Sequence, residues 1–211
     1  MKVTYLTVGP VGENTFLAIN EQTNEALLID PGDEPDAIEQ AIAEAGVTVK
    51  AILITHTHFD HVGAVAPMAR RTGAEVWVPK LEHAILADIN TYMNFPGVGP
   101  FESYDAEHDV AGGERLNLAG FEIDVFFTPG HSPGHVSYSI PEHKALFSGD
   151  VLFQGSVGRT DLPGGDTQTL LDAIAMLIAE LPGDTTVFPG HMGMTTLASE
   201  QRTNPFLASA R

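Results

Sequence analysis

The sequence predicts an α/β protein with two mixed β-sheets flanked by helices, built as one domain over residues 1–211. Three observations lead to this prediction. Strand-like and helical runs alternate in two successive strand-rich halves. The length of 211 residues allows one large domain with a sizeable core. The chain also lacks a repeat of fixed period and any low-complexity tract, which argues against a repeat protein or a disordered chain.

Local patterns predict where each element lies. Short runs rich in β-branched and aromatic residues, bounded by turn residues, indicate strands. Apolar residues three and four positions apart indicate helices. Strands are expected at residues 3–8, 15–19, 26–29, 50–54, 75–78, 114–118, 121–127, 136–140, 144–147 and 186–188. Helices are expected at residues 35–45, 62–71, 80–89 and 167–181, and two long loops, which are often functional, at residues 90–105 and 154–165.

Composition narrows the classes of protein and of site. A hydrophobic content of 43% with 18% charged residues is typical of a globular chain. No apolar run reaches the roughly 18 residues of a membrane span, and the N-terminus lacks the layout of a secretion signal, so we expect a cytoplasmic protein. The absence of cysteine removes disulfides and thiolate ligands. Any metal must therefore take nitrogen and oxygen ligands, which suit zinc, iron, manganese or nickel.

The charge balance bears on binding partners. Ten basic and 28 acidic residues give a net charge of −18, which disfavours nucleic acid and anionic membranes as partners. Bound divalent cations would reverse the sign of the field locally. The bulk charge therefore does not decide the substrate, and the oligomeric state stays open.

The most informative segment reads His56-Thr57-His58-Phe59-Asp60-His61 and follows the apolar run at residues 51–54. It places four metal-binding side chains within six residues. Side chains alternate in an extended segment, so the imidazoles of His56 and His58 point the same way. Asp60 and His61 follow where the chain bends toward the next helix. This density of ligands directly after a predicted buried strand indicates a metal site.

Three later residues extend the candidate site: His131, Asp150 and His191 each follow a strand-like run and stand beside a glycine. Five imidazoles and two carboxylates suit a two-metal hydrolytic centre, in which the ions lie roughly 3.5–4 Å apart. Asp150 is expected to bridge the ions, because a carboxylate has two oxygens whereas an imidazole has one free nitrogen. Such ions lower the pKa of a bound water to about 7, and Asp60 would orient the resulting hydroxide toward a carbonyl carbon.

Other residues have two interpretations. His135 either supports the metal ligands or is a structural histidine, and we expect the structural role. Arg159 either binds a substrate carboxylate or pairs with Asp161 inside its loop, and we expect the internal pair. The aromatic residues of the first long loop either line a pocket mouth or anchor the loop by packing. These residues are Tyr92, Phe95, Phe101 and Tyr104.

In their order along the chain, these motifs resemble the metallo-β-lactamase fold superfamily. The resemblance also includes the turn Asp30-Pro31-Gly32 and covers nearly the whole chain. It implies an αββα sandwich with the metals at the edges of the sheets. It assigns one metal ion to His56, His58 and His131, a second to Asp60, His61 and His191, and the bridging position to Asp150.

Residues 149–153 and 158–166 resemble the glyoxalase II-like branch, most closely its short, single-domain bacterial members. The resemblance implies hydrolysis of S-2-hydroxyacylglutathione by a metal-bound hydroxide, with two divalent ions, most readily zinc. The longer enzymes of that branch hold glutathione with a basic C-terminal region, whereas this chain has only Arg202 and Arg211 there. A conjugate of another small thiol is therefore an open alternative.

Four further alternatives remain. Persulfide dioxygenases share the fold and the segment at residues 158–161, and they would hold one iron on His56, His131 and Asp150. True β-lactamases are exported, which the N-terminus does not favour. A lactonase is a weaker alternative. A non-catalytic metal module is disfavoured, because structural zinc sites close with four protein ligands whereas seven leave room for water.

Overall fold

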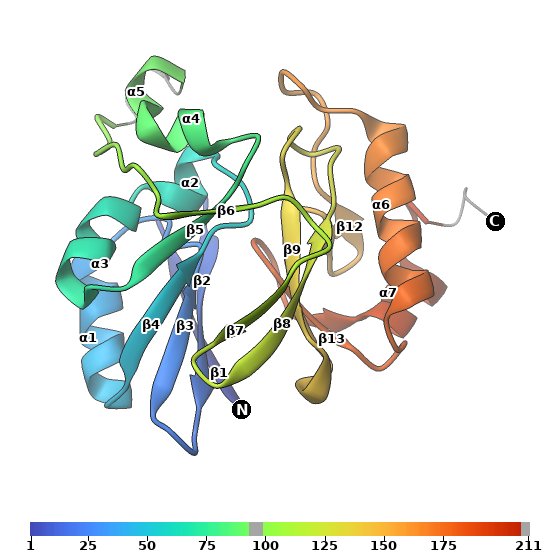
Figure 1. The fold of residues 1–211 in the computed structure, drawn as a ribbon. Helices are drawn as coiled ribbons and strands as arrows, with labels where there is room; N and C mark the ends of the chain where they lie inside the picture. The colour runs from blue at the N-terminus through green and yellow to red at the C-terminus, as the bar shows by residue number, and fades with distance from the viewer. Residues whose placement is uncertain (93–98, 208–211) are drawn as a thin grey trace. The chain divides into compact units, whose positions relative to one another are not determined.

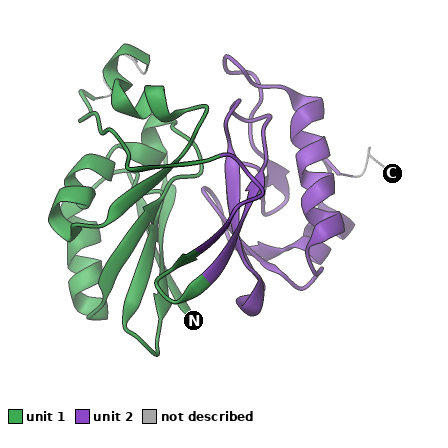
Figure 2. Cartoon of the chain, in the orientation of Figure 1, with its two compact units in different colours: residues 1–110, 117–121 green, residues 111–116, 122–211 purple. Residues whose placement is uncertain are grey.

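The computed structural model of the protein describes residues 1–92 and 99–207. Its backbone contacts divide the chain into two compact units, coloured separately in Figure 2. Unit 1 consists of Met1–Val110 and Asn117–Phe121, and unit 2 of Ala111–Leu116 and Glu122–Arg211. Two six-stranded mixed sheets with attached helices are present, which confirms the predicted α/β class. The prediction of one domain over the whole chain stays a prediction.

The sheet of unit 1 has the strand order β1-β2-β3-β4-β5-β6. The first three strands form an antiparallel meander, and β3 to β6 run parallel to one another. The central strand β3 is almost entirely buried, as expected of a strand covered on both faces. The strands are β1 (Lys2–Val8), β2 (Glu13–Asn20), β3 (Glu25–Ile29), β4 (Thr48–Leu53), β5 (Glu75–Pro79) and β6 (His108–Val110).

Helices α1 and α3 contact each other beside the sheet of unit 1 (Figure 1). Ile38 of α1 and Met68 of α3 are fully buried with Leu28 and Ile52 from the central strands. Gly46 ends α1 in a left-handed conformation that costs glycine little. The helices of this unit are α1 (Pro35–Ala45), α2 (Phe59–Val62), α3 (Val65–Thr72), α4 (His83–Ala87) and α5 (Ile89–Tyr92).

The second sheet has the strand order β14-β13-β10-β9-β8-β7. Strands β10 and β13 are parallel, whereas β9 runs antiparallel to both of its neighbours. A short hairpin of β11 (Leu152–Phe153) and β12 (Ser156–Val157) follows β10. The sheet strands are β7 (Arg115–Leu118), β8 (Phe121–Phe127), β9 (Val136–Ile140), β10 (Ala145–Gly149), β13 (Thr186–Pro189) and β14 (Thr195–Thr196).

Helix α6 (Thr167–Glu180) supplies most of the helical part of the core of unit 2. Its Leu170, Ile174 and Leu177 are fully buried with Leu146 of β10 and Val187 of β13. The Asp166 side chain caps the helix by accepting a hydrogen bond from the Thr169 amide. A second helix, α7 (Leu197–Thr203), begins directly after β14, and Pro141–His143 forms one 3-10 turn.

Parallel strands bring the candidate ligands of each unit to one sheet edge. In unit 1, Asp30 follows β3 and the segment at residues 56–61 follows β4, and these two strands are parallel. In unit 2, Asp150 follows β10 and His191 follows the parallel strand β13. The carboxyl ends of parallel strands meet at one edge, which is where open α/β sheets bind ligands.

Several predicted elements need correction. The helix predicted at residues 62–71 is two helices, α2 and α3. The Ala64 amide binds the Pro31 carbonyl at 3.0 Å, and a side chain at Gly63 would meet the Gly32 carbonyl, so the chain turns there. The helix predicted at residues 80–89 is α4 followed by α5, separated at Asp88. The predicted loop at residues 154–165 contains β12. Residues 93–98 of the other predicted loop, with Phe95, lie outside the described residues.

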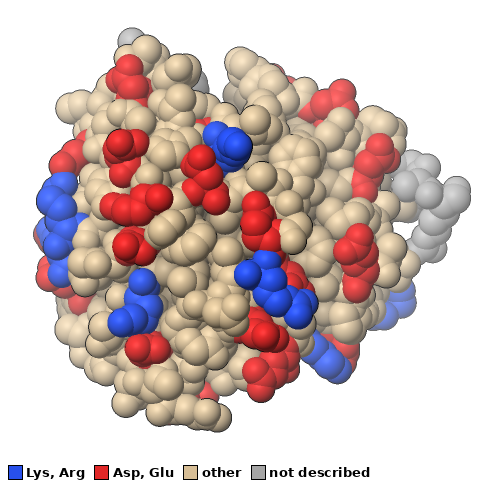
Figure 3. Space-filling model, in the orientation of Figure 1, with Lys and Arg blue, Asp and Glu red and all other residues tan. Residues whose placement is uncertain are grey.

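Charged side chains of both signs are interspersed on the face of the protein shown in Figure 3. The exposed Arg115 guanidinium, for example, pairs with Asp124 at 2.6 Å. Among the described residues, no helix combines the length and the apolar character that crossing a bilayer requires.

Candidate metal centre

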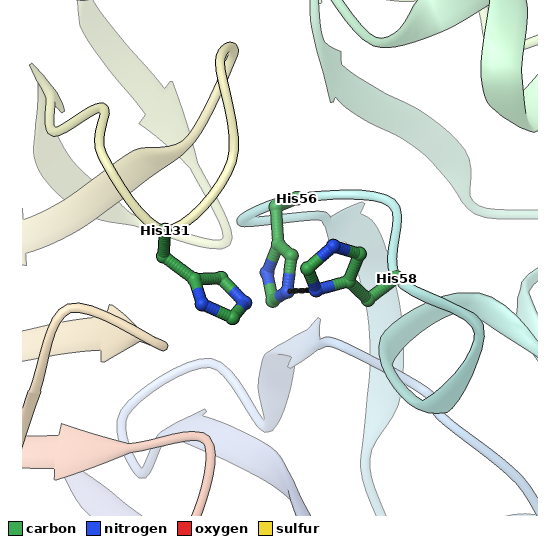
Figure 4. A group of neighbouring side chains, drawn as sticks. All are labelled: His56, His58 and His131. Atoms are coloured by element: carbon green, nitrogen blue, oxygen red, sulfur yellow. Dashed lines mark hydrogen bonds between the residues drawn. The ribbon is translucent and has the colours of Figure 1, made fainter. Parts of the chain in front are cut away.

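His56 and His58 present ring nitrogens to each other in unit 1. His56 Nε2 lies 3.1 Å from His58 Nδ1, as the dashed line in Figure 4 shows. The other nitrogen of His56, Nδ1, lies 3.1 Å from the Thr55 hydroxyl. That hydroxyl donates its proton to Asp30 at 2.7 Å, so it accepts from His56 Nδ1–H. This tautomer leaves the Nε2 lone pair of His56 available for a metal ion.

Asp30 orients His61 in the same way. The Asp30 carboxylate accepts hydrogen bonds from the Thr55 amide and hydroxyl, both at 2.7 Å, and from His61 Nδ1 at 3.0 Å. The Nδ1–H of His61 is thus committed to a carboxylate, which fixes the ring and makes Nε2 the more basic ligand atom. The ring of His61 lies 4.1 Å from that of His56, and its Nε2 lies 3.9 Å from Asp60 Oδ2. All four predicted ligands of unit 1 therefore cluster.

Glu13 lies behind His61 in a fully buried position. Its Oε1 is 3.9 Å from His61 Nδ1, and its Oε2 lies 2.9 Å from the Thr15 hydroxyl. Burial raises the pKa of the Glu13 carboxyl well above its ordinary value, and the nearby His61 opposes that rise. Glu13 is thus a fully buried carboxyl group directly behind the ring of His61.

Glu82 holds the turn between the first two histidines. Its Oε2 accepts from the Thr57 amide at 2.6 Å and from the Thr57 hydroxyl at 2.9 Å. Glu82 is 2% exposed and follows β5, the neighbour of β4. A buried carboxylate on this backbone restrains the segment that carries His56 and His58.

In unit 2, Asp150 lies between two imidazoles. Its Oδ2 is 3.4 Å from His131 Nε2 and 3.6 Å from His191 Nε2. His131 is almost fully buried, whereas His191 is partly exposed. All three predicted ligands of unit 2 therefore cluster, and the same carboxylate oxygen lies near the Nε2 atoms of both rings.

The loop after β12 positions His131 and Asp150. His131 Nδ1–H donates to the Arg159 carbonyl at 2.8 Å, so its Nε2 is the nitrogen available to a metal ion. The neighbouring Gly158 must be glycine, because an added Cβ would lie 1.8 Å from the Asp150 carbonyl oxygen. The loop therefore approaches both ligands more closely than any side chain at this position would permit.

His135 supports Asp150 through the backbone. The Asp150 amide donates to His135 Nε2 at 3.1 Å, so Nε2 is the acceptor and Nδ1 carries the proton. That Nδ1–H points to the Thr128 hydroxyl at 3.0 Å, which in turn contacts the Ser137 hydroxyl. His135 is thus buried and hydrogen-bonded within unit 2, and one of its hydrogen bonds holds the backbone of the candidate ligand Asp150.

Arg159 forms the expected pair within its loop. Its Nε and one terminal nitrogen bind the two oxygens of Asp161 at 2.7 and 2.8 Å. These hydrogen bonds lower the pKa of Asp161 to about 2. A substrate-binding role for Arg159 stays a prediction. Of the aromatic residues, Phe101 stacks on Phe59, whereas Tyr104 donates to Glu107 and Tyr92 is exposed.

The donor atoms fit divalent metal ions. All seven predicted ligands offer an imidazole nitrogen or a carboxylate oxygen, the ligand types that zinc, iron and manganese accept. Hydrogen bonds direct the Nε2 atoms of His56, His61 and His131 away from their fixed Nδ1 partners. Carboxylates or carbonyls on the far nitrogen are typical of histidines that bind metals.

Sequence reasoning missed the roles of several supporting residues. The sequence pattern indicates a turn at Asp30 but no function for its side chain, and it indicates none for Glu13, Thr55 or Glu82. The position of Asp30 after a strand parallel to β4 is a signal that could have identified it, because such strand ends share an edge. The contact made by the Arg159 backbone carbonyl cannot be predicted from the sequence, because every residue has such a carbonyl.

Comparison with known proteins establishes the family. The sequence profile of the metallo-beta-lactamase superfamily matches residues 8–191. The chain is 40% identical to the probable metallo-hydrolase YqgX of Bacillus subtilis, with 98% of each chain covered. It is 36% identical to the hydroxyacylglutathione hydrolase GloC of Haemophilus influenzae, with 99% of each covered. This chain therefore belongs to the metallo-β-lactamase superfamily, a family of metal-dependent hydrolases.

Solved structures agree with this assignment. The crystal structure of the BLEG-1 B3 metallo-beta-lactamase matches with a TM-score of 0.91 at 39% identity, covering 98% of this chain and 99% of the other. The crystal structure of TTHA1623 in a di-iron-bound form matches with a TM-score of 0.86 at 40% identity, covering 97% and 100%. The fold thus implies binding of divalent metal, and iron is among the metals that a similar chain holds.

Proposed function

We propose that this chain is a dinuclear metallohydrolase that cleaves thioesters of a small thiol, such as S-2-hydroxyacylglutathione. The observation that carries the proposal is the position of Asp150 Oδ2, 3.4 Å from His131 Nε2 and 3.6 Å from His191 Nε2. The proposal assigns His131 and His191 to different ions. Asp150, which lies near both of them, is therefore suited to bridge the two ions. The family match supports it further, because residues 8–191 include all seven ligands.

The proposed ligand sets follow the sequence expectation. His56, His58 and His131 would hold one ion and Asp60, His61 and His191 the other, and Asp150 would contribute to both. Zinc is the metal that we propose first, with iron or manganese as alternatives, since availability decides among ions that the same ligands accept.

The chemistry divides between the ions and the side chains. Bound divalent ions supply an activated water and polarise the thioester carbonyl. The Asp60 carboxylate orients the attacking water by accepting its hydrogen bond, takes up its proton, and returns a proton to the departing thiolate. Asp30 and the Arg159 carbonyl hold His61 and His131 in the tautomers that keep Nε2 available.

Hydrolysis of β-lactams is a second candidate activity. The similarity to BLEG-1, a B3 metallo-beta-lactamase at 39% identity, favours it specifically. In both substrates the activated water attacks a carbonyl carbon: the amide carbonyl of the strained β-lactam ring, or the carbonyl of the thioester. We place thioester hydrolysis first, because residues 149–153 and 158–166 resemble the glyoxalase II-like branch, to which the similar GloC belongs by its name.

Metal analysis with three parallel assays tests the proposal. The purified protein is expected to hold two divalent ions per chain and to hydrolyse S-lactoylglutathione or the lactoyl ester of another small thiol. One iron per chain with oxygen uptake on a thiol persulfide would instead establish persulfide dioxygenase activity. Turnover of a cephalosporin without thioester hydrolysis would favour the second candidate.

The variant Asp60→Asn tests the role of the carboxylate. The neutral amide cannot take up the proton of the attacking water, so kcat is expected to fall about 10²–10⁴-fold, the usual contribution of a general base. Because Asp60 is only partly buried, the thermal unfolding midpoint should stay close to that of the unmodified protein. Near-full thioesterase activity in a metal-loaded Asp60→Asn protein would contradict the assignment.

A further inference from the structure

A small cavity in unit 1 reaches Asp60. Its volume is about 140 Å³. The side chains of Phe59 and Phe101 and the acidic residues Asp33 and Asp60 contribute to its lining. Asp33 and Phe59 are not among the seven candidate metal ligands. The remaining lining residues are Gly9, Pro10, Gly32 and Gly99.

Two glycines that line this cavity lie in tight turns. A Cβ at Gly32 would lie 1.7 Å from the Asp60 carbonyl oxygen, so the turn after β3 packs directly on the backbone of α2. Gly9, in the turn after β1, has a φ of +67°, which disfavours any larger residue. Both turns that border the cavity therefore depend on glycine.

The aromatic wall is held firmly. The rings of Phe59 and Phe101 stack with their centroids 6.0 Å apart. Phe101 also packs on the buried core of unit 1, and a Cβ at Gly63 would touch its ring at 3.1 Å. The position of Phe101 thus limits how large a group the cavity admits.

Asp33 supplies the polar part of the wall. Its Oδ1 accepts a hydrogen bond from the Glu34 amide at 2.7 Å, and its Oδ2 would lie 3.2 Å from a Cβ added at Gly9. Among the residues that the structure describes, none donates a hydrogen bond to this Oδ2. The lining of the cavity therefore combines two aromatic residues with Asp33, whose Oδ2 is able to accept a hydrogen bond from a ligand.

We propose that this cavity binds the acyl group of the substrate, and that Asp33 Oδ2 accepts the hydrogen bond of its 2-hydroxyl group. This inference rests on the proposed thioesterase function. A cavity of about 150 Å³ accommodates benzene, so one of this size suits the roughly five non-hydrogen atoms of a lactoyl group. The Asp33 charge repels carboxylates, which directs a carboxylate-bearing thiol carrier away from this cavity.

Binding of neutral acyl analogues tests the cavity without turnover. Lactamide and propanamide differ in the 2-hydroxyl alone, and each is titrated onto the full-length protein by NMR. Lactamide is expected to bind about tenfold or more tightly than propanamide, because a site built to bind a hydroxyl rejects the analogue that lacks it. Asp33→Ala should remove the difference, and Asp33→Asn should restore part of it, since its amide oxygen still accepts. Equal binding of both analogues, or none, to the unmodified protein overturns the proposal.

Hydrolysis of an ester series tests the size limit. Phe101→Ala is expected to raise the ratio of kcat/KM for S-mandeloylglutathione over S-lactoylglutathione by about tenfold or more, because it opens the wall to a phenyl group. Phe206→Ala, which removes an exposed phenyl group from unit 2, should leave that ratio unchanged. If the alanine variant fails to fold, the same ratio is measured with Phe101→Leu. An unchanged ratio in a folded Phe101 variant overturns the size limit.

The two hypotheses fail differently. Selective lactamide binding without hydrolysis of any ester contradicts the thioesterase function and leaves the cavity as a site for a 2-hydroxy acyl group. Ester hydrolysis without an effect of Asp33 or Phe101 contradicts the cavity and leaves the thioesterase function standing.

Discussion

Individual side chains around the candidate ligands determine how the imidazole rings are oriented. Asp30 adopts a φ of +47°, which is uncommon for a residue with a side chain. In that conformation its carboxylate accepts from Thr55 and His61, while its carbonyl accepts from the Thr15 hydroxyl at 2.8 Å. Backbone strain at such a position persists only where the surroundings enforce it. The strain at Asp30 is balanced by these hydrogen bonds.

The variant Asp30→Asn should weaken metal binding. An amide nitrogen in place of Oδ2 would face two donors, the Thr55 hydroxyl and His61 Nδ1–H, so the ring loses its orientation. Metal affinity is expected to fall about 10–100-fold, the usual effect of losing such a partner. Competition with a chelator measures it. The control Asp36→Asn, at an exposed carboxylate on α1, should retain full affinity, and unchanged affinity in Asp30→Asn would refute the role.

Ligand identity at this scale was predictable, whereas ligand support was not. The ligands His56, His58 and Asp60 can be identified from the sequence, because metal-binding side chains rarely occur so close together by chance. Glu82 is separated from Thr57 by 25 positions, and only the pairing of β4 with β5 brings them together. A carbonyl such as that of Arg159 is present at every residue and carries no mark in the sequence.

At the scale of elements, α4 is joined to its neighbours by a histidine between two carboxylates. His83 Nδ1 lies 2.6 Å from Asp109, at β6, and its Nε2 lies 2.9 Å from Asp105. Both ring nitrogens must carry protons to donate to both carboxylates, so the interaction needs the imidazolium. The hydrogen bonds to Asp109 and Asp105 raise the pKa of His83 above its ordinary value of 6.5.

This arrangement predicts a pH-dependent stability. Because the pKa is raised in the folded protein, the stabilisation is complete below the ordinary value of 6.5 and is lost as the pH rises through the raised pKa. The thermal unfolding midpoint of the unmodified protein should exceed that of His83→Gln at pH 5.5, and the difference should shrink by pH 9. Measuring the difference at each pH cancels effects that both proteins share. A difference that grows with pH would contradict the prediction.

Two glycines on either side of β12, Gly155 and Gly158, should respond differently to substitution. Gly158→Ala places a Cβ 1.8 Å from the Asp150 carbonyl and 3.3 Å from His131 Nδ1, so it must displace both ligands. Metal content should fall, and the free energy of unfolding should fall by several kcal/mol, as in other overpacked sites. Gly155→Ala meets no atom within 4 Å, and its φ of +71° costs only about 1–2 kcal/mol. Urea unfolding and metal analysis of both variants check the contrast, which equal losses would refute.

At the scale of the whole molecule, the candidate ligands are divided between the two units, with four in unit 1 and three in unit 2. If all seven hold one pair of ions, metal binding must depend on residues from both units. Zinc at a free concentration about 100 times its Kd should then raise the free energy of unfolding by about 2.7 kcal/mol. Thermal or urea unfolding with and without zinc measures the increase.

Two variants decide whether both units take part. His61→Ala in unit 1 and His131→Ala in unit 2 should each lose most of the zinc-dependent stabilisation, and His131→Ala should lose activity with it. His143→Ala, at an exposed residue of the 3-10 turn, should keep both. Full stabilisation by zinc in either ligand variant would show that one unit binds the metal alone.

The sequence by itself determined the α/β class, most strand positions and the chemical type of the site, because periodicity and ligand density are local properties that each segment carries. It did not determine the break between α2 and α3, the short strands β6 and β14, or helix α7, since contacts with distant segments decide such elements. Only the tertiary structure showed that one oxygen of Asp150 serves His131 and His191, that Asp30 orients His61, and that a cavity reaches Asp60. These facts depend on strand order and register, which set the distance between residues far apart in the chain.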